Sequence, residues 1–303
     1  CLDLIDNNTE WFGQKLPAEI RRLRASCLQA QGKLKDAITE LESASQDVTS
    51  FDALKQRAQM YYEMGDLKKI SLVSRQLMAM PEITSQDALG LARMVMQDDA
   101  VLAQSLWGKA ISLDLPDELV GYAYSMGFNL GLEKRLGDLH QRFYEVAQKG
   151  TGGIAQFSQE EFKEFFSESV EKNINVSVLY EEGNIPVHLL AERQNITLAE
   201  LIFSRFSDIH QDWIVQGQPL FIRHGGKVVD KLLFEQDQQW RLHIDITAIL
   251  LADSLGILEH VQSLFAPLHI PLETIPTLIE MSGNVSPHQP SQIDIAKQIS
   301  ELV

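Results

Sequence analysis

Apolar residues in the first half of the chain recur at the spacing of one helix face, and short polar breaks separate the runs. The runs Leu54 to Tyr61 and Leu67 to Leu77 place apolar residues at helical spacing, with Gly65 between them. Spacings of i, i+3, i+4 and i+7 are typical of amphipathic helices. Glycine tolerates the positive φ that a tight reversal after a helix requires. The pattern therefore predicts two helices joined by a tight turn.

The break between the two runs returns every 33 residues, with Gly32, Gly65 and Gly131 in the turn and Asp98 in the remaining position. The residues four before, five after and twelve after the turn are also alike: Leu28, Tyr61, Met94, Gly127; Ala37, Ile70, Ala103, Leu136; Ala44, Leu77, Ala110, Phe143. Small residues lie in the middle of each first helix, where a close crossing excludes bulk: Ala25, Ala58, Ala92, Ala123. A helix pair of this length buries its apolar face only against a neighbouring pair, so the sequence predicts an α-solenoid. The alternative is a non-repetitive helical bundle with three glycines in phase.

The residues from about 10 to 147 resemble tetratricopeptide repeats. Tyr61, Gly65, Ile70 and Leu77 match that family's spacing of aromatic, glycine and small or apolar positions. The family's tryptophan and Leu-Gly pair are missing here, and a glycine stands in the aromatic position of the fourth unit. The resemblance implies a stack of antiparallel helix pairs that presents a concave face to a protein or peptide partner.

A cluster of three glycines between 150 and 153 marks the expected domain boundary. We therefore expect a helical-repeat domain over 1–150, a connecting segment of helices and strands over 151–240, and a further part over 241–303.

Local signals place the elements of the connecting segment. A capping box, in which a serine or threonine precedes an acid by three residues, predicts helix starts at Ser158 and Thr197. Pro186 suits the start of another helix. The apolar residues of 220–229 flank a His-Gly-Gly-Lys turn and predict a hairpin.

Composition excludes several classes of protein. The formal net charge of −16 disfavours broad electrostatic binding to nucleic acid or to anionic membrane. No apolar run approaches the ~18 residues of a membrane span, and no signal-peptide pattern is present. The two cysteines, Cys1 and Cys27, give neither a disulfide framework nor metal-ligand spacing, which suits a reducing, cytoplasmic compartment. A chain beginning with Cys1 fits a fragment of a longer protein better than a lipidated terminus.

Between 242 and 280, short apolar segments alternate with helical ones. The segments 242–245 and 268–270 are expected to be strands, each followed by helix. Such alternation predicts a parallel sheet, so the expected fold class is mainly α, with a small parallel or mixed sheet in a C-terminal α/β part. Asp245 ends the first expected strand, at the edge where open parallel sheets bind ligands.

Residues from about 240 to 303 resemble the first half of a PIN-like domain, a metal-dependent ribonuclease fold. The match rests on Asp245 after the first strand, Thr247 two positions on, and Glu280 late in the helix that follows the second strand. The resemblance implies that Asp245 and Glu280 bind Mg²⁺ or Mn²⁺, with Thr247 as a supporting hydroxyl and Asp294 as the third acid. It also implies an RNA substrate. The family's fourth acid has no counterpart in this chain.

Two functions follow from these patterns. The first is a protein–protein interaction module, in which the helical repeats bind a protein or peptide and the PIN-like part is coupled to them. The second is a Mg²⁺- or Mn²⁺-dependent ribonuclease regulated by the repeats. Against the metal site stands a simpler alternative, in which Asp245 caps a helix and Glu280 is a surface residue.

Overall fold

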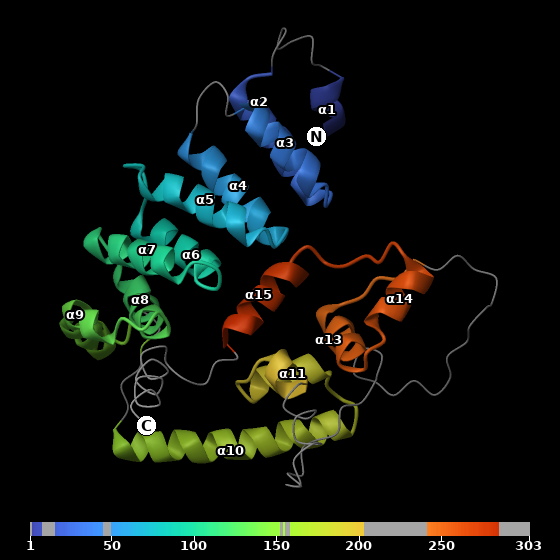
Figure 1. Cartoon of the computed structure of the whole chain (residues 1–303). Coiled ribbons are helices and arrows are strands. Elements are labelled where there is room, and N and C mark those ends of the chain that lie inside the picture. Colours follow the sequence, from blue (N-terminus) through green and yellow to red (C-terminus); the bar gives the residue numbers. More distant parts are fainter. Residues whose placement is uncertain are drawn as a thin grey trace, which may run out of the picture. The chain divides into compact units, whose positions relative to one another are not determined.

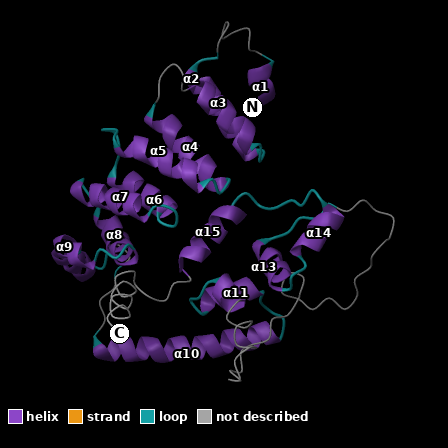
Figure 2. Cartoon of the chain, in the orientation of Figure 1, coloured by secondary structure: helices purple, strands orange, loops and turns teal. Residues whose placement is uncertain are grey.

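A computed structural model of the chain describes residues 2–7, 16–44, 50–151, 154, 158–202 and 241–284 (Figure 1). These residues form two compact units, one ending at residue 154 and the other running from 158 to 284. Both units are helical over most of their described length, as Figure 2 shows.

The first unit is a succession of helix pairs. Its helices are α1 (Leu2–Asp6), α2 (Ala18–Ala30), α3 (Leu34–Ala44), α4 (Phe51–Glu63), α5 (Leu67–Met78), α6 (Ser85–Val95), α7 (Ala100–Ser112), α8 (Asp117–Asn129), the 3-10 turn η2 (Glu133–Arg135) and α9 (Gly137–Lys149). Helix α2 packs on α3, α4 on α5, α6 on α7, and α8 on α9. The second helix of each pair also contacts the first helix of the next pair, so the pairs form a stack (Figure 1).

The turns between paired helices show why glycine recurs there. Gly32, Gly65 and Gly131 have φ values of 74°, 71° and 69°, a left-handed conformation that costs other residues energy. After each of them, the next residue donates its backbone N–H to the carbonyl five residues earlier, which closes a Schellman motif. Asp98 has no positive φ, and the N–H of Asp99 instead reaches the carbonyl of Val95, four residues back, at 2.8 Å.

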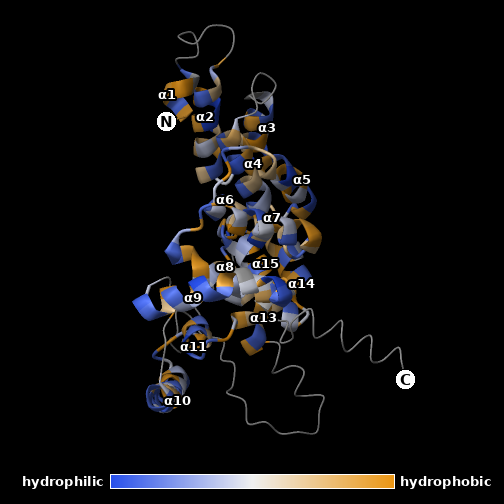
Figure 3. Cartoon of the chain, turned by 90° about the vertical axis from the view of Figure 1, so that its left-hand side faces the viewer, coloured by the Kyte–Doolittle hydropathy of each residue, from blue (hydrophilic) through white to orange (hydrophobic). Residues whose placement is uncertain are grey.

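The predicted small residues lie at the centre of the stack. Ala25, Ala58, Ala92 and Ala123 are at most 1% exposed. Larger apolar residues from both helices of the pairs surround them: Leu41, Leu54, Tyr61, Ile70, Leu77, Leu89, Leu102, Leu106. Buried apolar residues therefore recur in every helix from α2 to α8, and Figure 3 shows hydrophobic and hydrophilic residues interspersed along these helices.

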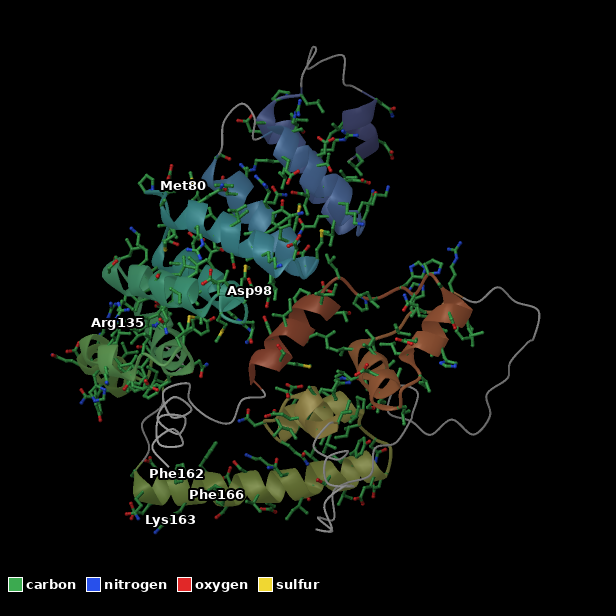
Figure 4. All side chains as sticks on the ribbon, viewed as in Figure 1. Met80, Asp98, Arg135, Phe162, Lys163 and Phe166 are labelled. Carbon is green, nitrogen blue, oxygen red and sulfur yellow. The ribbon has the colours of Figure 1, made fainter. Side chains whose placement is uncertain are left out.

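Gly127, which occupies an aromatic position of the repeat, is explained by a side chain from the preceding pair. Trp107 of α7 is fully buried, and its indole N–H donates to the carbonyl of Ala123 at 2.7 Å. A Cβ at position 127 would lie 3.3 Å or less from the Trp107 ring and 2.5 Å from the Leu136 side chain. Arg135, labelled in Figure 4, lies with its guanidinium carbon 5.4 Å from the centre of the Trp107 rings. Trp107 thus fills the volume that the missing aromatic residue leaves.

The second unit contains α10 (Gln159–Glu181), α11 (Val187–Arg193), a helical segment at 198–202, α13 (Ile246–Ser254), α14 (Leu258–Phe265) and α15 (Thr274–Asn284). Helices α10 and α11 pack together. The core combines the end of α10 and the segment up to 202 with one buried residue of α13: Tyr180, Val187, Leu190, Ala191, Leu198, Ala199, Leu201, Ile202, Leu250. Leu278 and Met281 of α15 pack against this cluster.

The predicted C-terminal sheet is wrong for the residues that the structure describes, none of which forms a strand. The two expected strands, 242–245 and 268–270, do lie side by side and parallel, but only one bridge joins them, between His243 and His269. Ile244 N–H donates to the His269 carbonyl at 2.9 Å, and His269 N–H donates to the Leu242 carbonyl at 3.0 Å. Helix α13 begins at Ile246, directly after the bridge, so the pairing ends before a ladder forms. The described chain is therefore mainly α, and the expected hairpin at 220–229 lies outside the described residues.

No single helix of the described ranges is long and apolar enough to cross a membrane. Helices α13 and α14 meet the length and composition requirement only when taken together, and they bend by 119° at the break between them.

Candidate functional site

A groove of about 680 Å³ crosses the first helices of three successive pairs in the first unit. Its lining runs from Arg22 on α2, through α4, to Met94 on α6. Because these helices line one groove together, they share one side of the stack. The groove is thus formed by several helix pairs and not by any one helix.

Two ion pairs link the helices along this groove. Arg22 Nη1 lies 3.2 Å from Asp52 Oδ2 and joins α2 to α4, and Lys55 pairs with Asp87 and joins α4 to α6. Arg22 and Lys55 are 33 residues apart, which is one repeat. Each pair brings one positive and one negative charge, so together they leave the groove without excess charge.

The Asp87 carboxyl has a pKa below its ordinary value. Partial burial alone would raise that pKa, but hydrogen bonds from Lys55 and Thr84 outweigh the burial. The contact with Thr84 is the capping box of α6, in which Thr84 and Asp87 each accept from the other's backbone N–H. One carboxylate therefore closes the start of α6 and holds the ion pair beside the groove.

Glutamine side chains supply much of the remaining polar lining. Gln29 Nε2 donates to both carboxylate oxygens of Glu63 at 2.8 Å, and Gln59 Nε2 donates to Glu63 Oε1 at 3.1 Å. Gln56 Nε2 donates to Ser26 Oγ at 2.9 Å. A carboxylate accepts hydrogen bonds and donates none, so the amide nitrogens of Gln29 and Gln59 must face Glu63. The amide oxygens of these two residues consequently point away from Glu63; both residues line the groove, and Glu63 itself lies outside the lining.

Gly90 lies in the middle of α6 and lines the groove. A Cβ built at this position would meet no atom within 4 Å, so the packing of the helices does not require glycine there. Glycine in a helix interior costs about 1 kcal/mol relative to alanine. At this position the groove is lined by backbone, with no side chain.

Asp245, the first predicted metal ligand, caps helix α13. Its Oδ1 accepts a hydrogen bond from the backbone N–H of Ala248 at 2.8 Å, and its own backbone is extended. The side chain lies at the surface. This is the capping role that the sequence offered as the alternative to metal binding.

The other predicted ligands are Glu280 and Asp294, with Thr247 as the supporting hydroxyl. Glu280 on α15 and Thr247 on α13 are each partly exposed, and Asp294 lies outside the described residues. Within the described ranges, no group of three or more His, Cys, Asp or Glu side chains has an arrangement that would hold a metal ion. The Mg²⁺ or Mn²⁺ site and the ribonuclease function stay predictions.

A second surface feature is a row of apolar side chains on α10, of which Phe162 and Phe166 are labelled in Figure 4 together with Lys163. The row follows an i, i+4 spacing, and each member is 45% exposed or more: Phe162, Phe166, Val170, Ile174, Val178. The space beside this row is about 350 Å³ and is lined by α10 alone, whereas the groove of the first unit is about 680 Å³ and is lined by several helices. The groove is therefore the stronger candidate site.

Sequence reasoning did not find the groove residues. One signal was available, because Arg22 and Lys55 occupy the same position in successive repeats. The glutamines give no such signal, since their roles depend on contacts between different helices. Comparison with models of protein families, with curated proteins and with solved structures finds no match for this chain.

Proposed function

We propose that the chain is a tetratricopeptide-like interaction module that binds an extended peptide segment of a partner protein in the groove of α2, α4 and α6. The observation that carries the proposal is a mixed lining around an open volume at Gly90, in which glutamines lie beside apolar residues such as Phe51, Leu91 and Met94. An extended peptide exposes backbone N–H and C=O groups along its length, and side-chain amides are suited to bond them.

The arrangement of the lining supports a preformed site. Glu63 fixes Gln29 and Gln59, Ser26 fixes Gln56, and the ion pair of Lys55 with Asp87 holds α4 against α6. Side chains that are already held lose less conformational entropy when a ligand binds. A peptide would therefore meet oriented groups on rigid helices.

Selection from a random-peptide display library against the whole chain tests the proposal. Gly90→Trp fills the groove from a position with free space, and Gly137→Trp makes the same change on α9, outside the groove, where a Cβ also meets nothing within 4 Å. We expect selected peptides to bind Gly90→Trp at least about ten-fold more weakly than the wild type, a change of about 1.4 kcal/mol. Binding to Gly137→Trp should be unchanged. Peptides that bind all three proteins alike, or a selection that yields none, would overturn the proposal.

A further inference from the structure

Three glutamines that line the groove of α2, α4 and α6 have their amide nitrogens engaged by the protein, which leaves their amide oxygens as acceptors. The Nε2 groups of Gln29, Gln56 and Gln59 donate to groups of the protein itself. Their Oε1 atoms face away from those partners, and an amide oxygen has two lone pairs to offer. The unpaired Nε of Arg22 is buried, so it does not present a donor to a ligand.

The carboxylate of Glu63, which is bonded to two of these glutamines, is negative, as are the partial charges on the glutamine amide oxygens. Glu63 is 8% exposed, and its hydrogen-bond partners are the two glutamines. Among the described residues no cation pairs with it, whereas the other charges at the groove, Arg22 with Asp52 and Lys55 with Asp87, cancel in pairs. Each glutamine amide directs its positive end to Glu63 and its negative end away from Glu63. Together, the carboxylate and the two aligned dipoles make this part of the groove negative.

Burial strengthens this effect. A carboxylate out of water acts through a lower dielectric than a surface carboxylate, so its field falls off less over the same distance. Salt also screens it less than it screens the acids on the outside of the helices. The net charge of the whole chain, −16, has the same sign and would attract a positively charged ligand from a distance.

We infer that the ligand of the groove is a basic peptide segment, in which a lysine or arginine donates to the outward oxygens of Gln29 and Gln59. The inference rests on the proposed peptide-binding function and adds the chemical class of the ligand. An acidic segment would meet like charge and too few donors. A neutral segment would satisfy the amide oxygens with backbone N–H groups but would gain nothing from Glu63.

The test compares the peptides selected on the wild-type chain with two variants of equal net charge. Glu63→Gln removes the charge beneath the groove, and Glu164→Gln removes one from an exposed position on α10. We expect the selected peptides to be rich in lysine and arginine, and to bind Glu63→Gln about ten-fold more weakly. Binding to Glu164→Gln should equal wild-type binding.

A second variant covers the case in which Glu63→Gln does not fold. Gln59 is exposed, so Gln59→Met removes its amide oxygen from a surface position while Gln29 still donates to both oxygens of Glu63, and it should weaken the same peptides. If peptides sensitive to Gly90→Trp are neutral or acidic, the inference fails while the proposed function stands. Equal weakening by Glu63→Gln and Glu164→Gln would also overturn it, because general attraction by the acidic chain would then explain the binding. If no peptide is sensitive to Gly90→Trp, the proposed function itself fails.

Discussion

At the scale of single residues, glycine has three different roles in this chain. Gly65 supplies a left-handed turn, Gly127 gives up volume to Trp107, and Gly90 leaves space that no other side chain fills. Only the first role can be recognised in a sequence, because such a turn between paired helices requires a residue with positive φ and the glycine therefore recurs at a fixed spacing. The other two depend on what another helix places opposite the glycine.

These roles predict opposite effects of one substitution. Gly127→Ala places a methyl group 2.5 Å from Leu136 and 3.1 Å from the Trp107 ring, and overpacking of this kind costs about 1–3 kcal/mol. Gly90→Ala meets no atom and should stabilise α6 by about 0.5–1 kcal/mol. Urea unfolding of both variants measures the difference. A loss of stability in Gly90→Ala would show that the glycine is required by the fold.

Asp245 leads to a prediction about capping. Asp245→Ala removes the acceptor for the Ala248 N–H and should cost about 1 kcal/mol, while Asp245→Asn should change stability by only a few tenths because asparagine caps about as well. Asp253→Ala, an exposed site near the end of the same helix, serves as the control. Thermal melts with and without Mn²⁺ complete the test. Stabilisation of the wild type by Mn²⁺ that Asp245→Asn abolishes would contradict a purely capping role.

At the scale of elements, helix starts were the most predictable features. The capping boxes expected at Ser158 and Thr197 are confirmed. Ser158 Oγ accepts from the Glu161 N–H at 3.2 Å, and Thr197 Oγ1 accepts from the Glu200 N–H at 3.0 Å. Such signals involve residues three positions apart and need no distant partner. The expected strands failed for the converse reason, since a strand exists only through a partner of sufficient length, and 242–245 and 268–270 share a single bridge.

The start of α6 predicts how stability responds to acid. Hydrogen bonds from Lys55 and Thr84 hold the pKa of Asp87 below its ordinary value of 3.8, although burial opposes them. A carboxyl whose pKa is lower in the folded than in the unfolded state raises the free energy of unfolding at pH values above its unfolded-state pKa. That contribution is lost as the pH falls through the folded-state pKa. We expect the stability of the first unit to fall as the pH drops below about 4.

Asp87→Asn measures this contribution, because asparagine keeps a capping oxygen and does not titrate. The variant should be less stable than the wild type at neutral pH, and the difference should shrink as the pH falls below about 4. Glu82→Gln, a change at an exposed acid just before α6, should leave the pH dependence of urea unfolding as it is in the wild type. If the stability of Asp87→Asn falls with pH as steeply as that of the wild type, Asp87 is not the source of the pH dependence.

At the scale of the whole molecule, the two units differ in how much of their packing can be predicted from the sequence. In the first unit, helices contact mainly the next one or two helices in the chain, so a local pattern repeated along the sequence describes most of the packing. The core of the second unit joins Tyr180 and Ile202 to Leu250, with Leu278 packed against them. Hydrophobic periodicity shows which face of each helix is apolar, but it does not show which distant faces meet.

The candidate groove could be predicted from the sequence only in part. Its existence follows from stacking first helices on one side, which the 33-residue period implies. Its chemistry does not, because the direction of the Gln29 and Gln59 amides is set by Glu63, on a surface where side chains from α2 and α4 meet. Polar groups that orient one another across helices leave no periodic trace in a sequence.

The neighbour-to-neighbour packing of the first unit also determines how it would respond to mechanical force. Helices of the first unit contact mainly the next one or two helices in the chain, so a chain pulled by its two ends can release one helix pair while the pairs further along remain folded. Each release would free one repeat of 33 residues, and a chain of that length extends by roughly 110–120 Å. The unit would therefore lengthen in a series of steps of similar size, and the candidate groove would be lost when α4 detaches from α6.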